Sequence, residues 1–516
     1  MMKTPIFVFN SLNVERGGLT KAVMKRANIL ADHYGKVVFF TLAFQQDHKN
    51  IIEKLYKSGQ LDRRVEVRNY YTDLLHISKV DNPKEASVEV EGFHAIQDKK
   101  SKQPAFRYYK DGVYKEYRRF NGDSTLKLID YMDDSRTRLS RAEYLRDGRL
   151  VRTSHMDYIT NKPKLHRYLL EDGTCRITVW VNPSGSEGRT ILFGEEDVEY
   201  DSINHAYAAW IDTAVLEYEA PVIMSDSRKT DETVQLVKAD VEKVAVAHNN
   251  HFESPYDETA KTKKSWNHFV EGINSFDHVV FLTHEQEKDI TSRYRVTTKL
   301  HVIPHAAPDT PPAQQAYQPK VAVTLARFEG QKRLDEGIAA FKHVVEKIPD
   351  AEYHIYGFGP LEDDLKAQIK RLGLEKNVKL LGFSSDPTAS YQSAACTILT
   401  SDFEGFGMVL TETLAAGTPA VAYDIKYGPK DIVRDDVDGY LVKKGDQKAL
   451  ADKVVAIMND SNLRDRLSER ATEVIERFSE ESFKKDWVEM FGQSYTPSEN
   501  DKSQEKKRSF FGFGRK

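Results

Sequence analysis

The chain has 516 residues, enough for two or three domains, and its 40% hydrophobic and 30% charged residues are typical of globular proteins. A formal net charge of −4 disfavours a general nucleic-acid binder, so we expect no nucleic-acid partner. The two cysteines, Cys175 and Cys396, form no disulfide framework, which favours a reducing, cytoplasmic location. No segment of the sequence approaches the length of a transmembrane helix.

The beginning of the chain predicts a Rossmann-like α/β domain. An apolar run at 6–9 is followed directly by polar Asn10 and Ser11, which favours a buried strand over a signal peptide. A Gly-Gly loop, a helix with apolar spacing and a second buried strand at 36–42 come next. Further buried strands are predicted at 220–226, 243–248, 278–283 and 300–304. We therefore assign residues 1–74 and 201–308 to this domain.

Residues 75–200 have a different pattern, which predicts an antiparallel β-meander inserted into the first domain. Three Asp-Gly pairs and one Asn-Gly pair lie near aromatic, β-branched or alternating runs, at 111–112, 147–148, 172–173 and 121–122. Such pairs are the strongest local signal for tight hairpins. The segment is also rich in Arg and Lys, which suits either an anionic partner or an ordinary solvated β-surface.

A second α/β domain is predicted at 309–478, after a proline- and glutamine-rich linker at 308–319. Buried strands and helical patterns alternate there as in a doubly wound sheet, and 446–477 looks helical. A C-terminal helix is expected within 479–495. The tail at 496–516 is polar, then basic and aromatic, which fits either a disordered tail or attachment to a membrane surface.

The segment from Glu404 to Glu412 is the most informative part of the second domain. The first carboxylate precedes a glycine-rich turn with Gly405 and Gly407, and the second lies in a predicted helix. Backbone N–H groups of such a turn can approach a ligand closely, and the helix N-terminus favours a phosphate. Two carboxylates on either side of a diphosphate suit the hydroxyl groups of a nucleotide-sugar.

Arg327 and Lys332 follow a buried strand at 321–326. Residues at the carboxyl end of a parallel strand lie where such folds bind ligands. Together a guanidinium and an ammonium can neutralise a diphosphate as the bond to its sugar breaks. The alternative is a solvated helix start with surface charges, which the nearby Glu404 to Glu412 segment makes the weaker interpretation.

Two further features are less specific. Gly17 and Gly18 open the first helix and either admit a phosphate or acceptor or allow close helix–strand packing. His248 ends a predicted strand and faces either a cleft or a structural hydrogen-bond partner. His251 and Glu253 lie near it, but their spacing matches no metal motif, so we expect no metal site.

Together, the Glu-x7-Glu segment, the upstream Arg-x4-Lys and the Gly-Gly loop resemble the retaining glycosyltransferases of family four. The resemblance covers nearly the whole chain and implies the GT-B fold, two facing Rossmann-like domains, here with an antiparallel β-rich insert. It implies that Arg327 and Lys332 bind the donor diphosphate, Glu412 the ribose of UDP, and Glu404 the transferred sugar. Backbone groups of Phe406, Gly407, Met408 and Val409 would hold the sugar and phosphate; Gly17 and Gly18 would line the phosphate end, and His248 would lie near the sugar.

The stretch 423–431 and the insert look like the wall teichoic acid α-glycosyltransferases of Gram-positive bacteria. That resemblance implies transfer of glucose or N-acetylglucosamine from UDP to a poly(glycerol- or ribitol-phosphate) without a metal cofactor, and homo-oligomerisation through the insert. Glycosyltransferases of serine-rich surface proteins share the layout and remain an alternative. A non-catalytic chaperone subunit is disfavoured because the donor residues are retained.

Overall fold

The computed structural model describes residues 2–14, 17–77, 82–311, 313 and 316–495. The chain divides into two compact units, residues 1–244 and residues 245–516, and the division falls inside a strand, β15. The tail at 496–516, with its two interpretations, lies outside the described residues. The domain boundaries expected from the sequence stay predictions. No helix in the described part of the chain is long and apolar enough to cross a membrane.

The first parallel sheet has seven strands in the order β17-β16-β15-β14-β1-β2-β3. Counted along the chain, this is the doubly wound order, in which the connections reverse direction between β1 and β14. The strands are β1 (Thr4–Phe9), β2 (Val37–Thr41), β3 (Val65–Asn69), β14 (Pro221–Ser225), β15 (Glu242–Ala247), β16 (His278–Phe281) and β17 (Lys299–Val302). The helices between them are α1 (Gly18–Tyr34), α2 (His48–Lys57), α3 (Tyr70–Leu74), α4 (Ile203–Ala214), α5 (Asp231–Leu236), α6 (Asn267–Glu271) and α7 (His284–Arg293).

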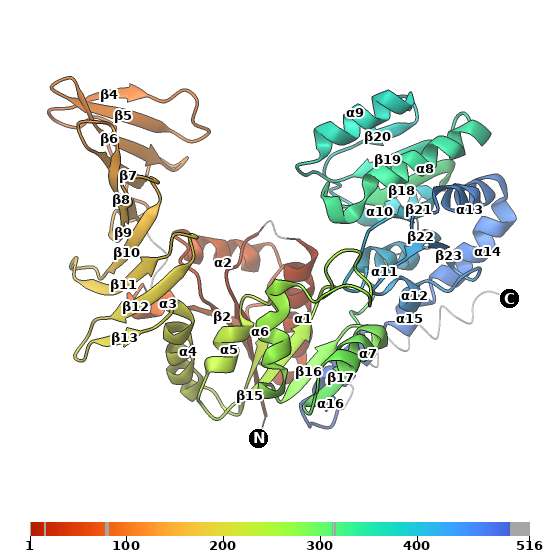
Figure 1. Ribbon diagram of the computed structural model, residues 1–516, viewed down its shortest axis with the longest axis horizontal. Coiled ribbons are helices and arrows are strands. Elements are labelled where there is room, and N and C mark those ends of the chain that lie inside the picture. Colours follow the sequence, from red (N-terminus) through yellow and green to blue (C-terminus); the bar gives the residue numbers. More distant parts are fainter. Residues whose placement is uncertain (1, 15–16, 78–81, 312, 314–315, 496–516) are drawn as a thin grey trace. The chain divides into compact units, whose positions relative to one another are not determined.

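The predicted β-meander is confirmed as a ten-stranded antiparallel sheet in which each strand pairs with its neighbours in sequence (Figure 1). Its strands are β4 (His94–Gln97), β5 (Ala105–Lys110), β6 (Val113–Phe120), β7 (Leu126–Met132), β8 (Arg138–Tyr144), β9 (Leu150–Met156), β10 (Pro163–Leu169), β11 (Cys175–Val181), β12 (Glu187–Leu192) and β13 (Val198–Tyr200). The three Asp-Gly pairs all lie between paired strands. At Asn121-Gly122 the left-handed residue is Ser124, so that turn is longer than the dipeptide suggests.

An aromatic cluster joins this sheet to the Rossmann-like part of the same unit. The ring of Tyr168 on β10 lies 4.4 Å from Tyr71 on α3 and 5.2 Å from Phe44, centroid to centroid. Tyr71 and Tyr168 are both fully buried. The Gln46 amide also donates a 2.7 Å hydrogen bond to the carbonyl of Lys127 on β7. The insert is therefore attached by a packed aromatic core rather than by its two chain connections alone.

The second parallel sheet has six strands in the order β20-β19-β18-β21-β22-β23, again with the reversal in the middle. Its strands are β18 (Gln318–Leu325), β19 (Glu352–Tyr356), β20 (Val378–Leu380), β21 (Ala394–Leu399), β22 (Ala420–Asp424) and β23 (Gly439–Lys443). The helices that alternate with these strands or follow them in the chain are α8 (Leu334–Lys347), α9 (Glu362–Leu372), α10 (Pro387–Gln392), α11 (Met408–Ala415), α12 (Pro429–Ile432), α13 (Gln447–Asn459), α14 (Ser461–Ala471), α15 (Val474–Arg477) and α16 (Glu480–Met490). Every residue of β21 is buried, as expected for a strand covered on both faces.

The expected α/β class is confirmed, with differences at the edges of elements. The predicted helical stretch 446–477 forms three helices, α13, α14 and α15. β18 begins at Gln318, so Pro319 belongs to a strand rather than to the linker. Proline is tolerated near the start of a strand, where its missing N–H removes little of the ladder.

Truncating Tyr168 to alanine should destabilise the first unit by about 3–5 kcal/mol, because the change leaves a large cavity at a fully buried position. Urea denaturation followed by circular dichroism measures this as a lower midpoint for the unit. Ile159→Ala is the matched control, since Ile159 is 92% exposed, and its effect should stay within about 0.5 kcal/mol. Equal midpoints for the two variants would contradict the packing role.

Candidate functional site

A cavity lies at the point where the second sheet reverses its strand order, between the carboxyl ends of β18 and β21. Open α/β sheets bind ligands at this point. Its walls come from the two strands, the loops that follow them and the start of two helices: Thr324, Leu325, Ala326, Lys332, Leu334, Thr397, Ile398, Leu399, Thr400, Ser401, Glu404 and Val409. The sequence therefore brings three of its predicted site residues, Lys332, Glu404 and Val409, into one cavity.

Lys332 and Glu404 form a partly buried ion pair in this cavity. The Lys332 ammonium lies 2.7 Å from Oε1 of Glu404, and the Ser401 hydroxyl donates a second 2.7 Å hydrogen bond to the same oxygen. The Glu404 side chain is only 10% exposed. Because the carboxylate has a cation and a hydroxyl donor, it is fixed in position.

The loop that carries Lys332 is tied to the loop that carries Glu404. Lys332 ends a short 3-10 turn, Gly330–Lys332. The Gln331 amide donates to the carbonyl of Phe403 at 2.9 Å, and the Asp402 N–H donates to the carbonyl of Gln331 at 2.8 Å. These hydrogen bonds hold the two loops together. Lys332 therefore lies in an ordered loop rather than in the solvated helix start considered from the sequence.

Arg327 follows Ala326 at the rim of the cavity rather than lining it. Its side chain is 57% exposed and pairs with the carboxylate of Glu329. Arg327 and Lys332 are thus on the same connection after β18, but only Lys332 contacts Glu404 in this structure. The exposed guanidinium can reach a ligand by giving up a surface ion pair, a contact of small energetic value.

The turn from Gly405 to Val409 presents backbone rather than side chains. A Cβ on Gly405 would lie 1.9 Å from the carbonyl oxygen of His248, so only glycine fits there. The ring of Phe406 is buried, and Gly407 adopts the left-handed conformation that starts α11. Met408 and Val409 form the first turn of that helix, whose N–H groups and dipole suit an anionic ligand.

Glu412 lies one turn further along α11. The hydroxyl of buried Tyr391 on α10 donates a 3.2 Å hydrogen bond to Glu412 Oε2. Burial, and then the Glu412 charge, raises the pKa of Tyr391 well above its ordinary value, so the phenol remains a donor. Glu404 and Glu412 therefore have separate hydrogen-bond partners and do not form a carboxylate pair.

His248 follows the end of β15, as predicted, and is half-buried. Its ring stacks on His305, with centroids 5.4 Å apart and planes 12° apart, and His305 in turn meets the edge of Phe406 at 5.8 Å. With the contact between Gly405 and the His248 carbonyl, this places the His248 loop against the Glu404 turn.

Gly17 and Gly18 belong to the other unit, between β1 and α1. Gly17 is the N-cap of α1, and a Cβ added there would meet no heavy atom within 4 Å. Close packing therefore does not explain Gly17, and open space remains in front of this helix terminus.

Among the described residues, no group of three or more His, Cys, Asp or Glu side chains could hold a metal ion. His251 is fully buried, and its Nδ1 lies 3.4 Å from the Tyr427 hydroxyl. Burial lowers the pKa of His251 to about 3, so its ring is neutral at ordinary pH.

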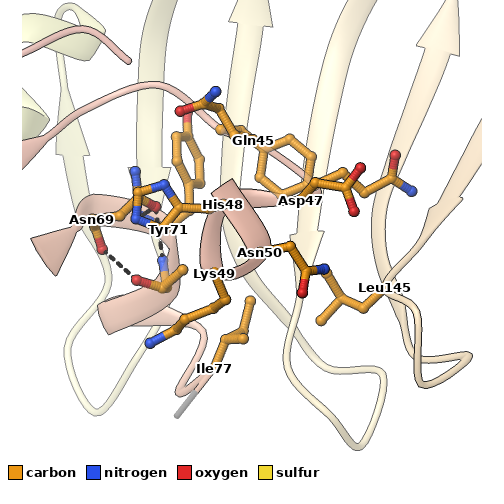
Figure 2. Close-up of a pocket in the computed structure, with 12 residues that line it drawn as sticks. Gln45, Asp47, His48, Lys49, Asn50, Asn69, Tyr71, Ile77 and Leu145 are labelled. Carbon is orange, nitrogen blue, oxygen red and sulfur yellow. Dashed lines mark hydrogen bonds between the residues drawn. The ribbon is translucent and has the colours of Figure 1, made fainter. Parts of the chain in front are cut away.

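A second pocket lies within the first unit, where the start of α2 meets α3 and the insert residue Leu145 (Figure 2). Among its lining residues, His48 is 3% exposed, and its Nδ1 has no hydrogen-bond partner in the described part of the chain. Burial lowers the pKa of His48 to about 4.

Sequence reasoning missed three residues that contact predicted site residues, and two exposed aromatic residues in loops of the same unit. Ser401, Tyr391 and His305 support Glu404, Glu412 and His248, and nothing local in the sequence singles them out. Phe358 and Phe383 are 62% and 72% exposed in the loops after β19 and β20. Each follows a glycine, and Gly357 N–H donates to the Gly382 carbonyl at 2.7 Å. The sequence signal for these two residues was an aromatic residue directly after a glycine at the end of each of two predicted strands.

Known proteins match both halves of the chain. Residues 309–474 match the family model described as glycosyl transferases group 1, and residues 6–184 match glycosyl transferase 1 domain A. The poly(glycerol-phosphate) alpha-glucosyltransferase of Bacillus subtilis is 27% identical over 93% of this chain and 74% of its own. The poly(ribitol-phosphate) alpha-N-acetylglucosaminyltransferase of Staphylococcus aureus is 26% identical over 95% of this chain and all of its own.

A solved structure gives the same fold. A mutant of S. aureus TarM in complex with Fondaparinux, alpha-GlcNAc-glycerol and UDP aligns with a TM-score of 0.82 at 24% identity, over 95% of this chain and 100% of that one. A GtfA subunit of a peptide N-acetylglucosaminyltransferase from Streptococcus gordonii is less similar, at 21% identity over 92% of this chain and 95% of its own. With its two doubly wound sheets, its inserted meander and these matches, the chain has the GT-B fold, and residues 309–474 form a glycosyl transferases group 1 domain.

Proposed function

We propose that this glycosyltransferase transfers glucose or N-acetylglucosamine from a UDP-sugar, with retention of configuration, to a poly(glycerol- or ribitol-phosphate) wall teichoic acid. The observation that carries the proposal is the similarity, over more than nine-tenths of this chain, to two enzymes whose names state polyol-phosphate acceptors. The ion-paired cavity at the β18/β21 reversal supplies the chemistry for the donor.

The donor diphosphate would lie between Lys332 and the first turn of α11, with Arg327 swinging in from the rim. Negative charge grows on the β-phosphate as its bond to the sugar breaks. An ammonium, a guanidinium and free helix N–H groups stabilise that charge more in the transition state than in the ground state. Lys332 exchanges part of its contact with Glu404 for the phosphate.

Glu404 and Glu412 would bind the two sugars of the donor. Glu404, fixed by Lys332 and Ser401, accepts hydrogen bonds from hydroxyls of the transferred hexose. Glu412, oriented by Tyr391, accepts from the ribose hydroxyls. Exposed Phe358 and Phe383 follow strands on the same edge of the sheet and offer faces on which the uracil can stack.

Retention follows if the acceptor attacks from the face that UDP leaves. The bond between the anomeric carbon and the β-phosphate oxygen breaks, the acceptor oxygen bonds to that carbon, and the hydroxyl proton passes to the β-phosphate. No protein nucleophile is required. The chain then contributes position and charge, with backbone groups of 406–409 and the nearby His248 holding the sugar in place.

The insert and the tail would serve the acceptor. We assign the Arg- and Lys-rich insert to binding of the anionic polymer and to homo-oligomerisation, and the basic, aromatic tail to contact with the membrane surface where such polymers are made. Deletion of residues 500–516 should then lower the fraction of protein that sediments with anionic vesicles.

Glycosylation of serine-rich surface proteins is the second candidate, and the similarity to the GtfA subunit favours it. A donor and acceptor screen separates the two. UDP-glucose and UDP-N-acetylglucosamine are each offered with polyglycerol phosphate, polyribitol phosphate and a serine-rich peptide. We expect labelled polymer with one of the two donors; labelled peptide with neither polymer labelled would replace the first proposal by the second.

Lys332→Ala should lower turnover by roughly a hundredfold or more, the effect of removing one transition-state donor. Steady-state kinetics of UDP release measures it. Lys347→Ala, which removes an exposed ion pair with Asp452, is the matched control and should keep full activity. Near-normal turnover of the Lys332 variant would mean that this ammonium does not meet the diphosphate.

Gly405→Ala should also lower turnover, by about a hundredfold, because the new methyl group must displace the Glu404 turn from the His248 carbonyl. Gly122→Ala is the control, since a Cβ there meets nothing within 4 Å. Full activity in both variants would show that the two loops need not be in contact.

Chelation of divalent cations by EDTA should leave turnover unchanged, because Arg327, Lys332 and the α11 N-terminus neutralise the diphosphate in this proposal. Initial rates with and without EDTA, and after addition of Mg²⁺ or Mn²⁺, check this. A rate that vanishes with EDTA and returns with metal would overturn the proposed metal independence.

A further inference from the structure

The segment Lys426–Gly428, which follows β22, supports the backbone of the Glu404 turn. The Glu404 N–H donates to the carbonyl of Lys426 at 3.1 Å, and the Tyr427 N–H donates back to the carbonyl of Glu404 at 3.0 Å. Gly428 packs so closely on Phe406 that a Cβ would lie 1.7 Å from the Phe406 carbonyl oxygen. The backbone position of Glu404 is thus set by the 426–428 segment.

The side chains of this segment are held in turn by α7. The Tyr427 hydroxyl donates a 2.8 Å hydrogen bond to Asp289 Oδ2, and the Lys426 ammonium lies 2.6 Å from the same oxygen. Glu285, one turn earlier on α7, lies 3.4 Å from that ammonium. Asp289 is 13% exposed and Tyr427 is fully buried, so these contacts are shielded from bulk water.

The loop after His248 is attached to the same points. The Asn250 side-chain amide donates to the Lys426 carbonyl at 3.3 Å, and Gln286 on α7 donates to the Asn249 carbonyl at 2.6 Å. The ring of His251 lies parallel to Tyr427, with a 6° angle between the planes. The 426–428 segment and α7 therefore hold both the Glu404 turn and the His248 loop.

We propose that Tyr427 and Asp289 are positioning residues for sugar transfer: their hydrogen bond sets the Glu404 turn against the His248 loop. The inference rests on the proposed function for the roles of Glu404 and His248. Neither Tyr427 nor Asp289 lines the donor cavity, and their hydrogen bond joins the 426–428 segment to α7 rather than to the Lys332 connection. Loosening this bond should therefore affect the position of the sugar, which Glu404 contacts directly, more than the binding of UDP.

Tyr427→Phe tests this, because it keeps the buried ring and removes the hydroxyl that donates to Asp289 and lies 3.4 Å from His251 Nδ1. In the full-length protein, kcat should fall by about ten- to a hundredfold, while the KM for the UDP-sugar and the Kd for UDP change by less than about threefold. Tyr440→Phe is the matched control: it removes a 3.0 Å hydrogen bond to Asp436 elsewhere in the same unit and should alter none of these values.

Hydrogen exchange gives a readout that needs no substrate. The Glu404 amide, which donates to Lys426, should exchange faster in Tyr427→Phe than in the wild type or Tyr440→Phe, while amides of β21 keep their protection. If Tyr427→Phe does not fold, Asp289→Asn carries the same measurements, because it keeps the shape and removes the charge.

The inference would be overturned if the Tyr427→Phe variant kept the kcat of the wild type and showed unchanged hydrogen exchange at Glu404. It would also be overturned if the variant lost kcat and UDP binding to the same extent. A wild-type protein that transfers sugar to no acceptor would overturn the proposed function instead. Exchange at Glu404 and the rate of UDP release into water would still decide the positioning role in that case.

Discussion

The ion pair between Lys332 and Glu404 is the interaction on which the site depends. It joins the connection after β18 to the connection after β21, at the point where the sheet reverses its order. Each group is mostly buried, so each needs the other: removing one partner of a buried pair typically costs about 3–5 kcal/mol because the remaining charge has no compensation. The pair thus holds both side chains in place before a ligand arrives.

Neighbouring residues hold the other predicted site residues in place in the same way. Ser401 donates a second hydrogen bond to the Glu404 carboxylate, Tyr391 orients Glu412, and His305 stacks on His248. Because most of these supporting groups are buried or backbone, the binding surface is built from fixed parts. In the proposed donor complex, a diphosphate would change the partners of Lys332 and Arg327 and leave these supporting groups in place.

The parts of this arrangement that have a local signature could be predicted from the sequence. Glycine spacing, charged residues after buried strands and Asp-Gly turns indicated the Lys332–Glu404 cavity, the start of α11 and the meander. What depends on distant packing could not be predicted: Tyr391 and Glu412 meet across 21 positions and His248 and His305 across 57, and no local pattern encodes such contacts. Two further features could not be predicted either: the orientation of Arg327 toward Glu329 and the longer turn at Ser124. Neighbouring residues decide each of them, rather than the residue type.

The antiparallel meander has a consequence for how the chain is made. Each of its ten strands pairs only with the strands next to it in sequence, whereas β1 must pair with β14, which emerges from the ribosome more than two hundred residues later. Local contacts form quickly and distant ones slowly. During synthesis the insert can therefore complete its own sheet while β1 of the first parallel sheet still lacks one neighbour, leaving an apolar edge exposed for that interval. Because β14 is translated late, β1, the strand before α1, is the last of the early elements to be paired on both edges.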